Sequence, residues 1–405
     1  MADDHREHGP ALLGQRWEVG SSFPLHLPAE PDWARTPGHP DPPSATPQYG
    51  ELFGSGRQAL RALVEFGRRE YGWTALHLPA YYCADVVDEV ADVLPVRRYP
   101  VGPTGGVPPV AAPTDAVVAV SYFGAPPVVP ATSGATLVVD ATHDPRAPWL
   151  ASVRADYVFA SLRKTLPVPD GGALWSDTGR PVPPAGPPTA RHLGLVDRVL
   201  SAMYLKAAYL SGGPVDKQQY LARYAAGEDL FRDSGISGIS EFSRQMLRVL
   251  PTDRLRRRRI ENAALLAAGL SGLSGLRARA HTLGVVLEFD SHRRREAVRH
   301  ALIDRRVYPA VLWRLGPDPA PEDRAPVELT MDDRVSFSRR MLFLHTDYRC
   351  TGSDLAQVAE LVREIHPTTA ANPVRTGGDG VPSSGGTVPS SGGTAPNGRG
   401  RGEPC

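Results

Sequence analysis

The chain alternates between short apolar runs and longer amphipathic stretches. Largely apolar runs at residues 116–120, 136–140 and 156–160 have the length and composition of buried strands. Residues 56–66 instead place apolar side chains at the i, i+3, i+4 and i+7 positions of a helix. Buried strands separated by helical or long connections are typical of a mostly parallel sheet with helices on both faces. The pattern therefore predicts an α/β fold.

The same alternation continues on both sides of these runs. Residues 75–79 and 172–175 predict two more strands, and residues 86–90 predict a helix. From about residue 190 to residue 270 the chain is helical in character, and residues 254–266 continue a long helix there. We interpret this long helix as the connection into a second, smaller domain.

The residues that follow predict a smaller α/β domain. Strands are expected at 284–289 and 341–344, and helices at 294–304 and 353–365. The end of the chain repeats Val-Pro-Ser-Ser-Gly-Gly-Thr, a composition that cannot bury enough apolar area to offset ordering entropy. We therefore expect four parts: an irregular N-terminal arm (1–48), a large domain (49–250), the long helix with the small domain (251–368), and a disordered tail (369–405).

Charge and composition argue against several classes of function. The 405 residues carry a net charge of +1, which gives no field that would attract nucleic acid or a membrane surface. No apolar run reaches the roughly 18 residues of a membrane-spanning helix, and the polar N-terminus does not resemble a signal peptide. Three scattered cysteines indicate neither a zinc site nor a disulfide framework. We expect a cytoplasmic protein without a metal, a nucleic-acid partner or a membrane partner.

Lysine is scarce in this chain, and the few lysines are therefore informative. Among 45 lysines and arginines only three are lysines: Lys164, Lys206 and Lys217. A lysine retained under such a bias is expected to do what a guanidinium cannot, chiefly to attack a carbonyl and form a Schiff base. Lys164 stands before an Asp-Gly-Gly sequence, whereas the surroundings of Lys206 and Lys217 suggest no chemistry.

Three polar features fall where a parallel sheet gathers its ligands, at the carboxyl ends of strands. Asp140 ends one predicted strand, and Ser161 and Lys164 follow the next. Gly56 and Arg57 begin a helix, where free backbone N–H groups and the helix dipole can hold a phosphate. A Schiff-base lysine, an aspartate for a protonated pyridine nitrogen and a phosphate site match the needs of pyridoxal 5'-phosphate (PLP).

In this order the motifs resemble the fold-type I PLP enzymes, and among them the DegT/DnrJ/EryC1/StrS-like sugar aminotransferases. The resemblance covers about residues 53–365. It is carried by five segments: Ser55-Gly56-Arg57-Gln58-Ala59-Leu60, Leu78-Pro79-Ala80-Tyr81-Tyr82-Cys83, Asp140-Ala141-Thr142-His143, Ser161 to Lys164 with Asp170-Gly171-Gly172, and Leu344-His345-Thr346-Asp347-Tyr348-Arg349.

The resemblance implies a role for each candidate residue. Lys164 and Asp140 would be the catalytic pair, with Lys164 on the aldehyde and Asp140 on the pyridine nitrogen. His143 would approach the ring hydroxyl, and Tyr82 would lie over the ring. The phosphate would be held by three residues: Gly56, Arg57 and Ser161.

Some positions differ from the family's pattern. The spacing between Ser161 and Lys164 is shorter than usual, and Cys83 stands where an aromatic ring-stacking residue is common. The asparagine that often reaches the neighbouring subunit's cofactor is missing around residues 236–241, and His345 replaces a usual proline. The chain is therefore identified as a distant member of the group.

The resemblance implies an aspartate-aminotransferase-like large domain, a smaller C-terminal α/β domain and a homodimer. The expected activity is transfer of an amino group from an amino acid donor to a keto-sugar or specialised-metabolite intermediate. Two alternatives stay open: a PLP-dependent lyase, decarboxylase or dehydratase, and a non-catalytic protein of the same fold. No arginine can be assigned from the sequence to a substrate carboxylate.

Overall fold

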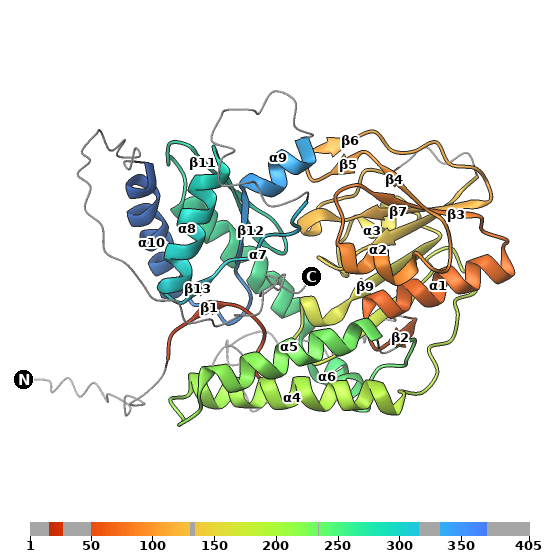
Figure 1. Cartoon of the computed structure of the whole chain (residues 1–405), viewed down its shortest axis with the longest axis horizontal. Coiled ribbons are helices and arrows are strands. Elements are labelled where there is room, and N and C mark those ends of the chain that lie inside the picture. Colours follow the sequence, from red (N-terminus) through yellow and green to blue (C-terminus); the bar gives the residue numbers. More distant parts are fainter. Residues whose placement is uncertain (1–15, 27–49, 130–133, 234, 316–332, 371–405) are drawn as a thin grey trace, which may run out of the picture.

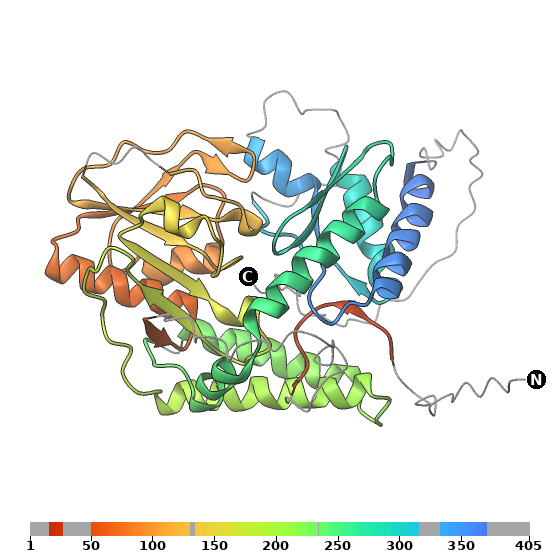
Figure 2. The same cartoon turned by 180° about the vertical axis from the view of Figure 1, so that it is seen from behind.

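The computed structural model describes residues 16–26, 50–129, 134–233, 235–315 and 333–370. Two groups of strands and helices lie side by side, and a pair of long antiparallel helices runs along one edge of both (Figures 1 and 2). Among the described residues, no helix combines the length and the apolar character that crossing a membrane requires.

The larger group is built on a six-stranded sheet with the order β10-β9-β8-β7-β3-β4. Neighbouring strands from β4 to β9 run parallel, and only β10 is antiparallel to its neighbour. The prediction of an α/β fold with a mostly parallel sheet is therefore confirmed. The strands are β3 (Ala75–Pro79), β4 (Val96–Tyr99), β7 (Asp115–Val120), β8 (Thr136–Asp140), β9 (Tyr157–Ser161) and β10 (Gly172–Trp175).

Helices cover both faces of this sheet. Along β8, Val138 belongs to the cluster that includes Leu60 and Leu63 of α1 (Gly56–Glu70). Its neighbour Val139 belongs to another cluster, into which α3 (Leu150–Val153) packs. Because successive strand residues point to opposite faces, a strand covered on both sides is apolar throughout. Its partner β7 is accordingly buried at every position.

The region predicted as one long helical stretch consists of four separate helices. A Gly-Gly-Pro sequence at 212–214 ends the first, since proline cannot continue a helix and glycine favours the turn. The first two helices pack against each other as an antiparallel hairpin (Figure 1). The four are α4 (Ala190–Leu210), α5 (Lys217–Asp233), α6 (Glu241–Val249) and α7 (Thr252–Gly269).

After α7 the chain forms the second group of elements, around an antiparallel sheet with the order β11-β12-β14. The strands expected at 284–289 and 341–344 are both present in it, whereas β11 was not predicted. Division of the chain at residue 250 remains a proposal. The elements are β11 (Leu276–Ala280), β12 (Gly284–Phe289), α8 (His292–Asp304), α9 (Asp333–Arg340), β14 (Met341–His345) and α10 (Gly352–Ala370).

The remaining elements are short. Part of the predicted N-terminal arm is ordered, because β1 (Val19–Gly20) pairs in parallel with β13 (Val307–Tyr308) of the second group. The rest of that arm and residues 371–405 of the predicted tail lie outside the described residues. The other short elements are β2 (Glu51–Phe53), α2 (Ala84–Val90), β5 (Val101–Gly102) and β6 (Gly105–Gly106).

Candidate functional site

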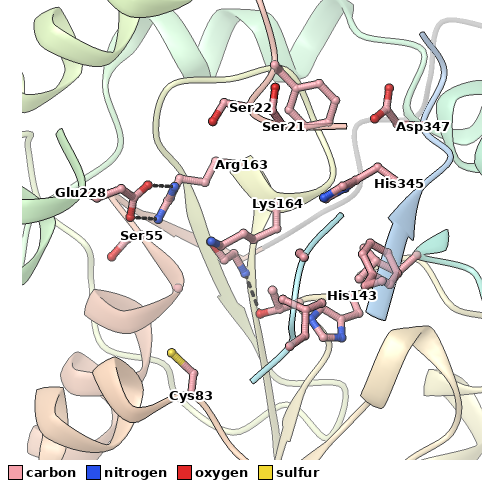
Figure 3. A pocket seen from close by; sticks show the side chains of 18 of the residues that line it. Ser21, Ser22, Ser55, Cys83, His143, Arg163, Lys164, Glu228, His345 and Asp347 are labelled. Atoms are coloured by element: carbon pink, nitrogen blue, oxygen red, sulfur yellow. Dashed lines mark hydrogen bonds and ion pairs between the residues drawn. The ribbon is translucent and has the colours of Figure 1, made fainter. Parts of the chain in front are cut away.

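A cavity of about 390 Å³ opens where β8 and β9 end, and side chains from both groups of elements line it (Figure 3). That volume is in the range of small-molecule sites. The fold brings to this cavity every residue that the sequence singled out: Gly56, Arg57, Tyr82, Asp140, His143, Ser161 and Lys164.

Lys164 occupies the centre of this cavity (Figure 3). Strand β9 ends at Ser161, and a single turn of 3-10 helix at Leu162–Lys164 carries the lysine off the sheet edge. Burial lowers the pKa of Lys164 to about 7, and the neighbouring charge of Arg163 adds to the effect. A large share of the amine is therefore unprotonated near neutral pH, which is the form that attacks a carbonyl.

Asp140 is buried at the end of β8 and is held by two donors. Its Oδ2 accepts a hydrogen bond from the Tyr82 hydroxyl at 2.5 Å, and its Oδ1 accepts one from the Thr142 backbone N–H at 2.9 Å. Burial raises the pKa of Asp140, although both hydrogen bonds act in the opposite direction, and no cation among the described residues offsets it. A cationic partner in the cavity would stabilise its charged form.

The Tyr82 side chain makes one hydrogen bond and one aromatic contact in this structure. Besides its bond to Asp140, its ring stands edge-on to Trp313, with centroids 5.7 Å apart. Burial, followed by the charge of Asp140, raises the pKa of Tyr82, so the phenol stays a hydrogen-bond donor. The role predicted for it, lying over a bound ring, stays a prediction.

His143 is neutral, with its proton on Nε2. Its Nδ1 accepts a hydrogen bond from the Phe123 backbone N–H at 2.9 Å, which assigns the tautomer. Burial lowers the pKa of His143 to about 3, and the charge of Lys164 lowers it further. The imidazole stacks on Trp313 at a centroid distance of 5.8 Å. It can therefore donate a hydrogen bond but carries no charge.

The first turn of α1 offers donors to an anion. Ser55 caps the helix, and its side chain accepts a hydrogen bond from the Gln58 N–H. A Cβ at Gly56 would lie 2.9 Å from the Ser161 backbone nitrogen, so this helix start and the end of β9 approach each other as only glycine allows. Arg57 Nη1 is buried, makes no hydrogen bond and lies 3.3 Å from Asp85.

Sequence reasoning missed an ion pair beside Lys164. Arg163 donates to both carboxylate oxygens of Glu228 on α5, at 2.5 and 3.0 Å, and its guanidinium lies 4.4 Å from the Phe231 ring centroid. Burial alone would raise the pKa of Glu228, but Arg163 and then Lys164 lower it. No spacing pattern could have shown this pair, since 65 residues separate its members.

The Asp-Gly-Gly sequence after Lys164 has a structural explanation. Asp170 is fully buried and accepts hydrogen bonds from the Ser240 N–H at 2.8 Å, the Ser240 hydroxyl at 2.7 Å, His192 at 2.9 Å and the Ser243 hydroxyl. A Cβ at Gly172 would lie 2.1 Å from the Ser55 carbonyl oxygen. This segment therefore fixes the start of α1 against the sheet, next to the predicted phosphate site.

The four arginines that line the cavity all have partners. The partners of Arg57 and Arg163 are described above. Arg259 donates to the Thr165 carbonyl at 3.0 Å, and Arg349 donates to Asp347 through two bonds of 2.7 and 2.8 Å. Arg259 is buried on α7. Within the described part of the chain, no guanidinium in the cavity awaits a substrate carboxylate.

Comparison with known proteins gives a resemblance of fold. No protein-family model matches the chain, and no curated protein matches it in sequence. Among solved structures, it resembles the sugar aminotransferase CalS13 from Micromonospora echinospora at 18% identity, over 78% of this chain and 86% of that one, with a TM-score of 0.48. It also resembles the aminotransferase TlmJ from Streptoalloteichus hindustanus at 17% identity, over 79% and 86%, with the same score.

A third similar structure is named as an enzyme of a different reaction type. The glycine decarboxylase P-protein of the glycine cleavage system aligns at 16% identity, over 88% of this chain and 86% of that one, with a TM-score of 0.44. At such identities and scores, the chemistry of this chain has to be derived from the residues of its own cavity.

Proposed function

We propose that this chain is a PLP-dependent aminotransferase. The observation that carries the proposal is the meeting of Lys164, Asp140 and the first turn of α1 in one cavity. These three features are what a pyridine aldehyde phosphate needs: an amine, a carboxylate and an anion site. They come from three separate segments of the chain, and on our proposal each would meet a different part of the cofactor.

The cavity's own residues fit the cofactor. Arg57 Nη1 lies 3.3 Å from Asp85 and makes no hydrogen bond among the described residues, and the first turn of a helix carries N–H groups without intrahelical partners, so a phosphate could accept from both. At the other end, Asp140 is a buried carboxylate that lacks a cation. A protonated ring nitrogen would supply one and would lower the pKa of Asp140.

The chain's residues would then divide the work. Bound PLP would supply an electron sink for the carbon next to the substrate's amino group. Lys164 would hold the aldehyde and, once released, would carry a proton at Nζ between substrate and cofactor carbons, a task suited to an amine with a pKa of about 7. Asp140 would keep the ring nitrogen protonated, and the Nε2–H of His143 would donate to the ring hydroxyl.

The proposed substrate class comes from the names of solved structures that share this fold. Solved structures with this kind of fold are named as sugar aminotransferases, which favours a keto-sugar or specialised-metabolite intermediate as the amino acceptor. We also propose that the protein works in the cytoplasm as a homodimer. Residues 49–250 would form the PLP-binding domain and residues 251–368 the smaller one.

One observation favours a second candidate, a PLP-dependent lyase, decarboxylase or dehydratase. An aminotransferase has to recognise the carboxylate of its amino acid donor, yet every described arginine in the cavity already has a partner. On our proposal, that carboxylate would displace one of these pairs or meet a residue of a second subunit.

The deciding experiment is an absorbance measurement. Purified protein mixed with PLP should show a visible band that borohydride abolishes, and Lys164→Ala should lack it. Arg69→Ala is the control, because Arg69 is exposed at the end of α1 and outside the cavity lining, so the band should be unchanged. Conversion of the bound cofactor to pyridoxamine phosphate by an amino donor would then separate transamination from the second candidate. A wild-type protein without the band would refute both.

A further inference from the structure

The N-terminal segment Arg16–His26, here called the strap, forms one wall of the cavity. Ser21, Ser22 and Phe23 of the strap line the cavity, and both serines lie above Lys164 in Figure 3. The strap runs between the α4–α5 hairpin and the second group of elements, where β1 pairs with β13. None of its residues was singled out from the sequence.

A buried carboxylate holds the strap to the helical hairpin. Glu18 has a side chain that is only 4% exposed, and its two oxygens lie 2.8 Å from Lys206 Nζ and 3.2 Å from Lys217 Nζ. Burial by itself would raise the pKa of Glu18, but the two lysines lower it. A carboxylate buried at this depth needs such partners, because an uncompensated buried charge is costly.

The two lysines also donate hydrogen bonds to the strap and to β13. Lys206 Nζ donates to the Ser21 hydroxyl and to the Ser22 carbonyl, both at 2.6 Å. Lys217 donates to the Tyr308 hydroxyl, and its ammonium lies 4.1 Å from that ring's centroid. A compact ammonium with three donors suits this convergence better than a flat guanidinium. We call Glu18, Lys206 and Lys217 the clamp.

The far side of the strap is held by Arg349, in the loop after β14. Its guanidinium donates to the Ser21 and Ser22 carbonyls, each at 3.1 Å, and lies 4.7 Å from the Phe23 ring centroid. Asp347 fixes that guanidinium from behind. The Ser22 carbonyl thus receives donors from α4 and from the second group of elements, so the strap joins the two.

The part of the strap that lines the cavity consists of Ser21, Ser22 and Phe23. The Ser21 hydroxyl is already engaged by Lys206 and Glu18. No described residue hydrogen-bonds the Ser22 hydroxyl, and Ser22 is exposed, with Phe23 beside it. The wall therefore offers one hydroxyl without a partner among the described residues, and the Phe23 ring beside it is fixed by Tyr348 and Arg349.

We propose that the clamped strap is the specificity-determining wall of the cavity, with the Ser22 hydroxyl and the Phe23 ring contacting the larger of the two substrates. The inference rests on the proposed function. Glu18, Lys206 and Lys217 are positioning residues, since they act through the strap. A small substrate bound at Lys164 need not reach this wall, whereas a bulky hydroxylated keto-sugar would rest on it.

Glu18→Gln tests the clamp. It keeps the side chain's size but removes the charge that pairs with two lysines. We expect hydrogen exchange of the backbone amides in residues 16–26 to accelerate at least tenfold, while the borohydride-sensitive PLP band is retained. We expect kcat/KM for a nucleotide-linked keto-sugar to fall at least tenfold relative to pyruvate, mainly through KM. Glu65→Gln is the matched control, because its pair with Arg61 lies within α1 and neither residue contacts the strap among the described residues.

Ser22→Ala tests the wall without touching the clamp, and it serves if Glu18→Gln does not fold. It should raise the KM for the keto-sugar several-fold and leave exchange in residues 16–26 unchanged. Unchanged selectivity between keto-sugar and pyruvate in Ser22→Ala and in any folded Glu18→Gln would overturn the proposal. So would loss of the PLP band in Glu18→Gln, because the strap would then serve the cofactor. A wild-type protein without that band would instead refute the proposed function, and hydrogen exchange would still test the clamp.

Discussion

At the scale of single residues, the two candidate catalytic groups are tuned in opposite directions by the same cause. Burial lowers the pKa of Lys164 to about 7 and raises that of Asp140, so each group is pushed toward its neutral form. A cofactor that brings an aldehyde to one and a cation to the other would relieve both penalties. Each group therefore gives a measurable signature before any substrate is known.

The Lys164 amine should make the stability of the cofactor-free protein depend on pH. Below pH 7 the Lys164 amine is protonated in both the folded and the unfolded protein, so the folded protein carries the full cost of burying its charge. Between about pH 7 and the ordinary lysine value of 10.5, only the unfolded form keeps the proton. The free energy of unfolding should then rise with pH, by up to about 1.4 kcal/mol per pH unit from this group.

Lys164→Met should remove that rise. Urea denaturation of both proteins from pH 7 to 9.5 measures it, and the difference between the two curves isolates Lys164 from other titrating groups. Lys206, whose pKa burial lowers to about 8, contributes equally to both curves. Curves that run parallel over this range would contradict a lowered pKa at Lys164.

Tyr82→Phe should separate the hydroxyl from the ring. Because the buried Asp140 carboxylate loses a donor at 2.5 Å, we expect the free energy of unfolding to fall by about 1–3 kcal/mol. The pH dependence of the PLP absorption band should also shift, since Asp140 then interacts differently with the ring nitrogen. Tyr99→Phe is the matched control: its hydroxyl donates to the Val118 carbonyl at 2.6 Å, outside the cavity lining. An equal spectral shift in the control would argue against a link through Asp140.

At the scale of elements, the sequence predicted what short-range pattern determines. The strands at 116–120, 136–140 and 156–160 were recognised because a strand buried on both faces is apolar throughout. In contrast, β4 was missed, since two of its four residues are arginines and exposed. The breaks between α4 and α7 were also missed, because helical periodicity continues on both sides of each break.

The close contact between Gly172 and the start of α1 gives a test at this scale. In Gly172→Ala, the new Cβ would meet the Ser55 carbonyl at 2.1 Å and push the helix start away from β10. We expect PLP affinity to fall at least tenfold, as measured by fluorescence titration. Gly194→Ala, in α4 with nothing within 4 Å of the new Cβ, should keep PLP affinity and gain up to about 1 kcal/mol in stability. Equal affinities in both variants would show that the contact does not hold the site.

At the scale of the whole molecule, the long helix α7 ties the second group of elements to the site. Arg256 donates to both oxygens of the buried Asp144, each at 2.8 Å, in the loop that follows Asp140 and His143. A second pair links Arg146 of the same loop to the exposed Asp253. Both pairs join segments more than 100 residues apart, so no local pattern predicts them.

The two pairs should differ in their effect on stability. Arg256→Gln leaves Asp144 buried without its cation, and we expect a loss of about 1–3 kcal/mol in the free energy of unfolding. Arg146→Gln breaks an exposed pair and should cost less than about 1 kcal/mol. Urea denaturation of the two variants at pH 7 measures the difference. Equal losses would mean that the buried pair contributes no more than the exposed one.

The site itself was predictable only in part, for the same reason. Lys164 and Asp140 stand at the ends of strands, where an apolar run gives way to a polar residue, and a sequence shows that change. Glu228 and the strap are brought in by contacts across 65 to 328 residues. Their side chains carry no local mark of function, and Lys206 and Lys217 were set aside for that reason.

The scarcity of lysine has a practical consequence. Protein grown with lysine labelled in its side-chain carbons would give three lysine signals by nuclear magnetic resonance. Two of them would report on the strap, through Lys206 and Lys217, and one on the cavity. The charge state of each amine and its response to any added small molecule would be read separately, without mutation. One spectrum would then report on both the candidate Schiff-base lysine and the wall that faces it.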